Sequence, residues 1–275
     1  MLAKTYDANK TLLAYPVYVQ PKLDGVRMLA NVRKGVLTSL ESRNGTDFDH
    51  LIPMFRADVE RAYASSNIPD SVTALDGELY AHGVPFQTIV SWVRNKSNAA
   101  VNEASLRKLE YHVYDLVDAT RTFDERYATL KAMPLCGKLV MVETTTANNK
   151  RDVDAYLKDA EARGYEGIML RACSRNYEMG KRSASLHKYK RFNTDEFTVV
   201  GVREATGRDK GTPVFELSVG NATFSARPTG TLEERRDLYR RRRELIGQRV
   251  TVQYQGVSTN GIPRFPVALV VRDYE

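Results

Sequence analysis

The chain has 275 residues, long enough for two domains with separate cores. Its 41 lysines and arginines outnumber its 34 aspartates and glutamates, and the net charge of +7 favours a polyanionic partner such as nucleic acid, although such a charge also serves solubility. Two cysteines are too few for a disulfide framework or a four-cysteine zinc site, and no apolar run reaches membrane-span length. We therefore expect an intracellular, cytoplasmic protein without a membrane partner.

The first predicted strands, at residues 17–19 and 26–32, flank a turn that carries Lys22, Asp24, Gly25 and Arg27. An ordinary lysine amine has a pKa of ~10.4, so it becomes a nucleophile only where cations, a metal or desolvation favour its neutral form. Arg27 supplies a cation, Asp24 can orient the amine, and Gly25 permits a tight turn. The turn is a candidate nucleophile site, although a Lys-x-Asp-Gly pattern also occurs in ordinary turns.

Further clusters of chemically useful residues follow along the chain. They are Ser-Arg-Asn-Gly at 42–45, Leu-Asp-Gly-Glu-Leu at 75–79, Tyr-His-Val-Tyr-Asp-Leu at 111–116, Tyr-Glu-Gly-Ile-Met-Leu-Arg at 165–171, Leu-His-Lys-Tyr-Lys at 186–190 and Pro-Arg-Phe-Pro-Val-Ala-Leu-Val-Val-Arg at 263–272. Alternating apolar residues predict strands at 75–80, 111–116, 167–171 and 197–202, and helical spacing predicts a helix through 153–160. After residue 192 the pattern becomes strand-turn-strand, with one late helix that begins at the capping box of Thr231 and Glu234.

In this order the clusters resemble those of the covalent nucleotidyltransferases, and among these the small ATP-dependent DNA ligases of viral and bacterial type. The resemblance covers residues 20–272. It implies an α+β fold, with a nucleotidyltransferase (adenylation) domain of antiparallel sheets and flanking helices at 1–192 and a small OB-fold β-barrel at 193–275. It also implies ATP-dependent sealing of 3′-hydroxyl/5′-phosphate nicks in duplex DNA, through a lysyl-AMP and then a DNA-adenylate.

The resemblance assigns a role to each candidate catalytic residue. Lys22 would attack the α-phosphorus of ATP, Asp24 would orient its amine, and Lys188 and Lys190 would lie against the α-phosphate. Since the two later lysines are two positions apart on a predicted strand, both amines are expected on one face. Taken without the resemblance, such a pair is an ordinary solvated strand face.

The nucleotide and its metal would be held by a second group of residues. Gln20 would read the adenine edge, Tyr114 would stack on the base, and Glu78 would contact the ribose, with Arg171 also assigned to the nucleotide. Glu166 and Glu78 are the candidate ligands for Mg²⁺, with Mn²⁺ as the second choice, because hard cations prefer carboxylate oxygens. Taken singly, Tyr114 is equally compatible with a core position and each glutamate with a surface position.

Several cations are assigned to phosphates. Arg27 and Arg43 would face the ribose and later the 5′-phosphate of the nick, and Arg264 and Arg272 would clamp the pyrophosphate. DNA would be gripped by a loop and by a helix stripe, whose members are Arg175, Lys181, Arg182, Arg236, Arg240 and Arg243. We expect no latch insertion near residues 208–211, and a monomer.

Alternatives remain open at this point. An RNA ligase shares Lys22 and both glutamates, and a GTP-dependent mRNA capping nucleotidyltransferase shares the lysine cluster and the barrel. From a different class, the chain could be an inactive nucleic-acid-binding module. ATP is preferred over NAD because the stretch before Lys22 leaves no room for a nicotinamide-reading domain, and the minimal type suggests a phage- or virus-encoded protein.

Overall fold

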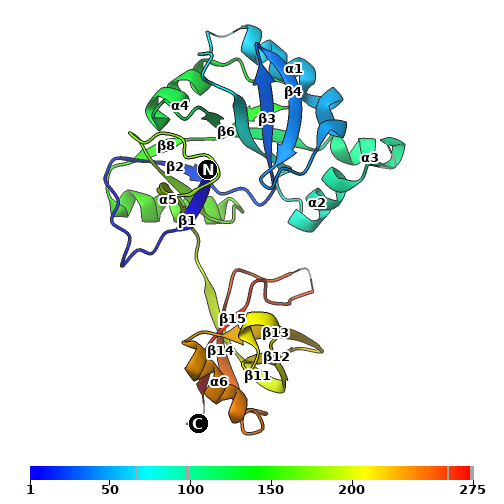
Figure 1. Ribbon diagram of the computed structural model, residues 1–275, viewed down its shortest axis with the longest axis vertical. Helices are drawn as coiled ribbons and strands as arrows, with labels where there is room; N and C mark the ends of the chain where they lie inside the picture. The colour runs from blue at the N-terminus through cyan, green and yellow to red at the C-terminus, as the bar shows by residue number, and fades with distance from the viewer. Residues whose placement is uncertain (66, 97–98, 259, 273–275) are drawn as a thin grey trace. The chain divides into compact units, whose positions relative to one another are not determined.

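The computed structural model describes residues 1–65, 67–96, 99–258 and 260–272 (Figure 1). This chain divides into two compact units, Met1–Lys190 and Arg191–Glu275. The first unit contains two five-stranded sheets with helices against them, and the second contains a closed five-stranded barrel with one α-helix. The predicted α+β class, with sheets and helices followed by a barrel, is confirmed.

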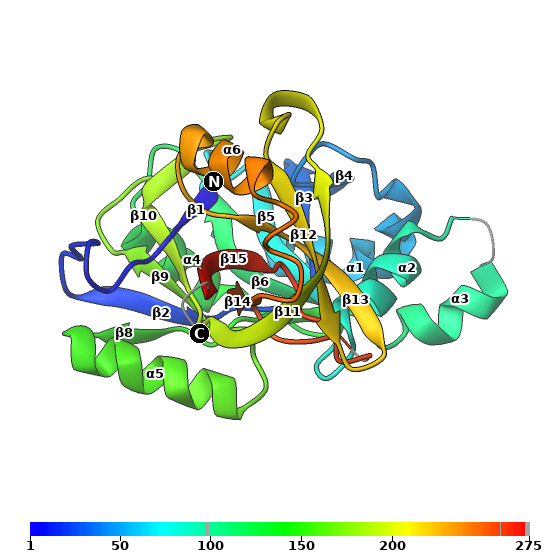
Figure 2. The ribbon, with the colours of Figure 1, turned by 90° about the horizontal axis from the view of Figure 1, so that it is seen from below.

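The first sheet is largely antiparallel and is backed by one helix. Its strand order is β1 (Leu2–Thr5), β10 (Arg182–Tyr189), β9 (Ile168–Ala172), β2 (Val17–Pro21) and β8 (Thr145–Ala147), with β1 parallel to β10. Helix α5 (Lys150–Ala162) contacts β2, β8 and β9, as Figure 2 shows. Alternation along β2 buries Val17 and Val19 against α5 and places Tyr18 and Gln20 on the opposite face.

The second sheet has the order β4 (Val36–Ser42), β3 (Val26–Arg33), β5 (Ala74–Tyr80), β6 (Glu110–Val117) and β7 (Leu139–Met141). Leu75 and Leu79 of β5 enter the core with residues of α1 (Ile52–Ala64), so Asp76 and Glu78 lie on the other face. The remaining helices of this unit are η1 (Asp49–Leu51), α2 (Phe86–Arg94), α3 (Ala99–Leu106) and α4 (Phe123–Ala132).

The second unit is a barrel with the order β11 (Asn193–Glu204), β12 (Pro213–Val219), β13 (Ala222–Pro228), β15 (Val267–Arg272) and β14 (Arg249–Tyr254). The predicted capping box at Thr231 and Glu234 begins α6 (Leu232–Arg240). Strands β11 and β12 are joined through η2 (Gly207–Asp209), and this described connection carries no inserted hairpin, as expected.

The predicted strands at 17–19, 26–32, 75–80, 111–116 and 197–202 lie within observed strands, and the helix at 153–160 lies within α5. Two expectations are wrong at element ends. Lys190 follows β10, which ends at Tyr189, and Arg243 follows α6, which ends at Arg240. No helix in the described ranges is both long and apolar enough to cross a membrane.

Buried ion pairs connect the two sheets of the first unit. Asp115 of β6 accepts hydrogen bonds from Nε and Nη2 of Arg126 on α4, at 2.7 and 3.0 Å, and from Nη1 of Arg171 on β9, at 2.7 Å. Asp115 and Arg126 are each 1% exposed. Removal of one partner from such a pair is costly, because it leaves a charge without compensation in a low-dielectric interior.

The substitution Arg126→Met therefore tests the contribution of this pair to stability. We expect a loss of about 3 kcal/mol or more in the free energy of unfolding. Denaturant titration of Trp92 fluorescence reports on the first unit, because Trp92 is the single tryptophan and lies in α2. The exposed pair of Arg107 and Glu103 supplies the control, since Arg107→Met should change stability by about 0.5 kcal/mol or less. Equal effects of the two substitutions would contradict the argument.

Candidate active site

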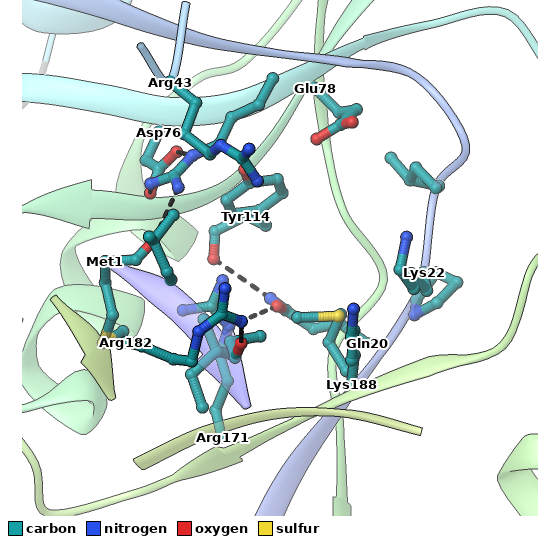
Figure 3. A pocket seen from close by; sticks show the side chains of 17 residues that line it. Met1, Gln20, Lys22, Arg43, Asp76, Glu78, Tyr114, Arg171, Arg182 and Lys188 are labelled. Carbon is teal, nitrogen blue, oxygen red and sulfur yellow. Dashed lines mark hydrogen bonds and ion pairs between the residues drawn. The ribbon is translucent and has the colours of Figure 1, made fainter. Parts of the chain in front are cut away.

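A cavity of about 290 Å³ is lined by residues from both sheets of the first unit (Figure 3). In Figure 3 the amines of Lys22 and Lys188 and the carboxylate of Glu78 point into it. Most of the predicted nucleotide residues belong to its lining, which includes Gln20, Lys22, Arg27, Arg43, Glu78, Tyr114, Arg171, Arg182 and Lys188. The sequence clusters thus meet in one place although they are far apart in the chain.

Backbone hydrogen bonds fix the turn that carries Lys22. Its N–H donates to the carbonyl of Gly167 at 2.8 Å, and its carbonyl accepts from the N–H of Glu166 at 3.2 Å. Close approach requires glycine at both turns. A Cβ on Gly25 would collide with the Leu79 carbonyl, and a Cβ on Gly167 would collide with the Tyr189 carbonyl. Gly25 thus allows the turn to lie directly on β5.

The Glu166 carboxylate holds two lysines. One oxygen accepts from the amine of Lys22, and the other accepts from the amine of Lys190 at 2.5 Å. Burial alone would raise the pKa of Glu166, but the two ammonium groups hold it below its ordinary value. Asp24, which was expected to orient the nucleophile, lies outside the cavity lining, and that role stays a prediction.

Lys188 and Lys190 do not share one environment. The amine of Lys190 contacts Glu166, whereas Lys188 lines the cavity. Burial lowers the pKa of Lys188, and the positive charges of Lys190 and Lys22 lower it further. Of the two, Lys188 therefore lies on the cavity wall, and Lys190 is paired with Glu166.

Two carboxylates on β5 have opposite surroundings. Asp76 is buried and accepts hydrogen bonds from Nε and Nη2 of Arg27 at 2.8 and 2.7 Å, and from the hydroxyl of Tyr177 at 2.7 Å. Glu78 lines the cavity, where burial raises its pKa from 4.5 to about 8 although Lys22 and Arg27 oppose the shift. The Arg27 guanidinium also donates to the Met1 carbonyl at 2.6 Å, so most of its donors have partners within the protein. The sequence analysis had expected it to face the ribose and the 5′-phosphate, and that role stays a prediction.

The predicted adenine-reading residue has its side-chain amide fully occupied. Gln20 is 2% exposed, its amide nitrogen donates to the Tyr114 carbonyl at 3.1 Å and to the Thr144 hydroxyl at 2.9 Å, and its amide oxygen accepts from Nε of Arg171 at 2.6 Å. A buried amide requires such partners, and the expected contact of Gln20 with the adenine edge stays a prediction. Arg171, 5.3 Å from the Tyr114 ring, is likewise bound to Gln20 and Asp115.

The other predicted cations are distributed over both units. Arg43 and Arg182 line the cavity, and Arg182 also donates to the Ala3 carbonyl at 2.6 Å. Arg175 and Lys181 are exposed on the segment between β9 and β10, and Arg175 borders a second cavity of about 730 Å³. In the second unit, Nε of Arg272 lies 3.2 Å from Glu196 and the guanidinium of Arg264 lies 5.8 Å from the Phe265 ring centre.

The predicted helix stripe is only partly realised. Arg240 pairs with Glu233 at 2.7 Å and with Asp237 at 3.5 Å, so its charge is compensated. Arg236 is exposed on α6, and Arg243 is exposed beyond its end. The sequence analysis missed Tyr177, Thr144 and Arg126, which fix Asp76, Gln20 and Asp115, because partners so distant in the chain leave no local pattern.

The carboxylates suit a metal ion that is shared with a ligand. Among the described residues, no group of three or more His, Cys, Asp or Glu side chains is arranged to hold a metal. Mg²⁺ commonly takes one or two carboxylates together with substrate phosphates and water. Glu78 and Glu166 fit that type of site, because Glu78 lines the cavity and Glu166 contacts the Lys22 amine at its edge.

Comparison with known proteins decides the family. A family model described as the ATP dependent DNA ligase domain matches residues 1–190, and one described as the DNA ligase OB-like domain matches residues 221–272. The chain belongs to the ATP-dependent DNA ligase family. The resemblance read from the sequence clusters is thereby confirmed.

Individual relatives of this ligase-family chain agree. It is 28% identical to a DNA ligase of Haemophilus influenzae, with 96% of this chain and 89% of that protein covered. It is also 28% identical to a probable DNA ligase of Streptomyces griseus, covering 78% of this chain but only 43% of that longer protein. A structure from a study of DNA binding with a minimal scaffold by Lig E DNA ligases has a TM-score of 0.76 and 26% identity, with 98% of each chain covered. A Chlorella virus DNA ligase-adenylate structure, at a TM-score of 0.53, 22% identity, and coverage of 100% of this chain and 98% of that one, supports the fold alone.

The raised pKa of Glu78 predicts that the stability of the ligand-free protein falls as the pH rises. Its pKa is about 8 when folded against 4.5 unfolded, so the folded state binds the proton more tightly. The resulting stabilisation is complete below about pH 4.5 and is lost as the pH rises through about 8. We expect Glu78→Gln to escape this loss, so its melting temperature should gain on the unsubstituted protein across that interval. Glu103→Gln, at an exposed position, should show no such trend, and a pH-independent difference for Glu78→Gln would refute the assignment.

Proposed function

We propose that this chain is an ATP-dependent DNA ligase that seals 3′-hydroxyl/5′-phosphate nicks in duplex DNA through a lysyl-AMP on Lys22 and then a DNA-adenylate. The observation that carries the proposal is the position of Lys22, whose amine lies at a cavity shared with Lys188 and Glu78 and is held by Glu166.

In the first step, the neutral amine of Lys22 attacks the α-phosphorus, a P–N bond forms, and the bond to the pyrophosphate oxygen breaks. Negative charge increases on the leaving pyrophosphate, so the protein contributes mainly orientation and cations. Lys188 is directed at the cavity and is suited to the α-phosphate, while Lys190 offsets Glu166. Arg264 and Arg272 are proposed to orient the pyrophosphate from the barrel.

A divalent cation, Mg²⁺ or Mn²⁺, would be held by Glu166 and Glu78 together with the phosphates, and would supply charge neutralisation there. Both Glu166 oxygens contact lysine amines in this structure, so a cation held there would compete with Lys22 and Lys190 for them.

The nucleoside would lie against Tyr114 and Glu78, on a wall that Gln20 and Arg171 keep rigid. In the later steps, AMP passes from Lys22 to the 5′-phosphate of the nick, and the 3′-hydroxyl then displaces AMP. Arg43 and Arg182 are suited to the 5′-phosphate because guanidinium groups bind phosphate through two parallel hydrogen bonds.

The adenylation chemistry is proposed for a domain at residues 1–192, and the barrel domain is proposed at 193–275. DNA is proposed to contact exposed cations of both, namely Arg175, Lys181, Arg236 and Arg243. We further propose that the protein acts as a monomer, inside the cell, on nicked DNA. A phage or a virus is the proposed source of the protein.

Intact mass spectrometry after incubation with ATP and Mg²⁺, followed by a chase with 5′-phosphorylated nicked duplex, tests this function. We expect one AMP adduct, discharged by the nick with formation of a sealed strand. Lys22→Ala should abolish the adduct, and Lys10→Ala, at an exposed lysine, should keep it.

Other outcomes of that experiment would select a rival. Discharge by an RNA nick alone would indicate an RNA ligase, and an adduct formed only from GTP would indicate a capping enzyme. Absence of any adduct, from protein not already adenylylated as purified, would leave a nucleic-acid-binding module.

A salt titration tests the barrel surface. Each lost phosphate contact lowers the slope of log K against log salt concentration by about one. The double substitution Arg236→Ala and Arg243→Ala should therefore weaken nick binding and reduce the slope by about two. Arg240→Ala serves as the control, because Glu233 and Asp237 already compensate its charge. The assignment fails if both variants bind with the slope of the unsubstituted protein.

A further inference from the structure

Four aromatic and imidazole rings form a cluster beside the nucleophile turn. The ring cluster consists of Tyr80 at the end of β5, His82 just after it, His112 on β6, and Tyr165 in the turn before β9. The Tyr80 hydroxyl hydrogen-bonds to Nδ1 of His82 at 2.8 Å. The Tyr80 ring lies 5.3 Å from His112 in an edge-on arrangement, and the His82 ring lies 5.1 Å from Tyr165.

The ring cluster is connected to the catalytic carboxylate through the backbone. Tyr165 immediately precedes Glu166, whose N–H donates to the Lys22 carbonyl at 3.2 Å. The N–H of Tyr165 donates to the Ala160 carbonyl at 2.9 Å, which ties the turn to the end of α5. His82 contacts the outer side of this turn, and the guanidinium of Arg163 lies 5.2 Å from the Tyr165 ring centre.

The exposure of His82 distinguishes a positioning role from a purely structural role for this side chain. Tyr80 is 5% exposed, but His82 is an exposed residue and Tyr165 is half-buried. An exposed side chain contributes little to the hydrophobic core, so its truncation should cost little stability. Its ring nevertheless contacts Tyr165, one residue before Glu166, and its hydrogen bond to Tyr80 orients that ring.

We propose that Tyr80 and His82 are positioning residues for lysine adenylylation, which hold Tyr165 and thereby the Glu166 carboxylate against Lys22. This inference rests on the proposed function. Placement errors of a fraction of an ångström in a group that orients a nucleophile lower the rate of the chemical step, because the reacting atoms are then less often aligned. Binding of ATP, which depends on the cavity wall, should change little.

Single-turnover formation of lysyl-AMP measures this effect. Tyr80→Phe deletes the hydrogen bond and His82→Ala deletes the ring, and we expect each to lower the rate at saturating ATP by about tenfold, with the KM for ATP unchanged within about twofold. Tyr165→Phe keeps the ring and should retain the original rate, whereas Tyr165→Ala should lose it. The Tyr80→Phe/His82→Ala double variant should be no slower than His82→Ala, since both act through one contact.

The control is Tyr156→Phe on α5, which removes a comparable 2.7 Å hydrogen bond to Thr145 of β8. It should leave the rate unchanged, and the melting temperature of His82→Ala should remain close to that of the unsubstituted protein. An unchanged rate in His82→Ala, or a raised KM at an unchanged rate, would overturn the positioning role. If the unsubstituted protein forms no adduct at all, it is the proposed ligase function that fails.

Discussion

The pairing of β2 with β9 is the constraint on which the site depends. Pro21 lies opposite Ile168, and the ladder continues past both strand ends through the backbone bonds of Lys22 with Glu166 and Gly167. Lys22 and Glu166 meet because this register holds. A slip of one residue would turn every side chain of β2 to the other face, placing Gln20 in the α5 core and Val19 at the cavity. The chemistry is therefore specified by the same hydrophobic alternation that specifies the sheet.

Near that pairing, buried ion pairs lie between the two sheets of the first unit, at positions that apolar side chains could also fill. Asp115 holds Arg126 and Arg171, and Asp76 holds Arg27. Buried ion pairs of this kind add little net stability compared with apolar packing, but their directional bonds admit few alternatives. One consequence is a cavity wall with fixed side chains. Gln20, bound on both sides, cannot rotate without losing a buried hydrogen bond.

Local patterns in the sequence predicted which elements form, because strand alternation and short turns are local properties. The resemblance to nucleotidyltransferases predicted which residues lie together. Neither predicted the hydrogen-bond and ion-pair partners of the residues in the site. Gln20 was expected to face adenine, but its partners Tyr114 and Arg171 are 94 and 151 positions away. The spacing of Lys188 and Lys190 placed both amines on one face, yet β10 ends between them and the second amine turns to Glu166. A spacing rule specifies a face only while the strand continues.

This separation of the two lysines has an electrostatic consequence. The cavity lining contains the cations Lys22, Arg27, Arg43, Arg171, Arg182 and Lys188 and the carboxylates Asp76 and Glu78. Arg27 and Arg171 are compensated by buried aspartates and Lys22 shares Glu166 with Lys190, so most of the positive excess in the lining lies with Lys188, Arg43 and Arg182 when Glu78 keeps its proton. A polyphosphate entering the cavity would offset that excess. Its negative charge would also oppose ionisation of Glu78, whereas a divalent cation held there, as proposed above, would favour it. Nucleotide and metal are thereby expected to bind cooperatively, each lowering the cost of the other.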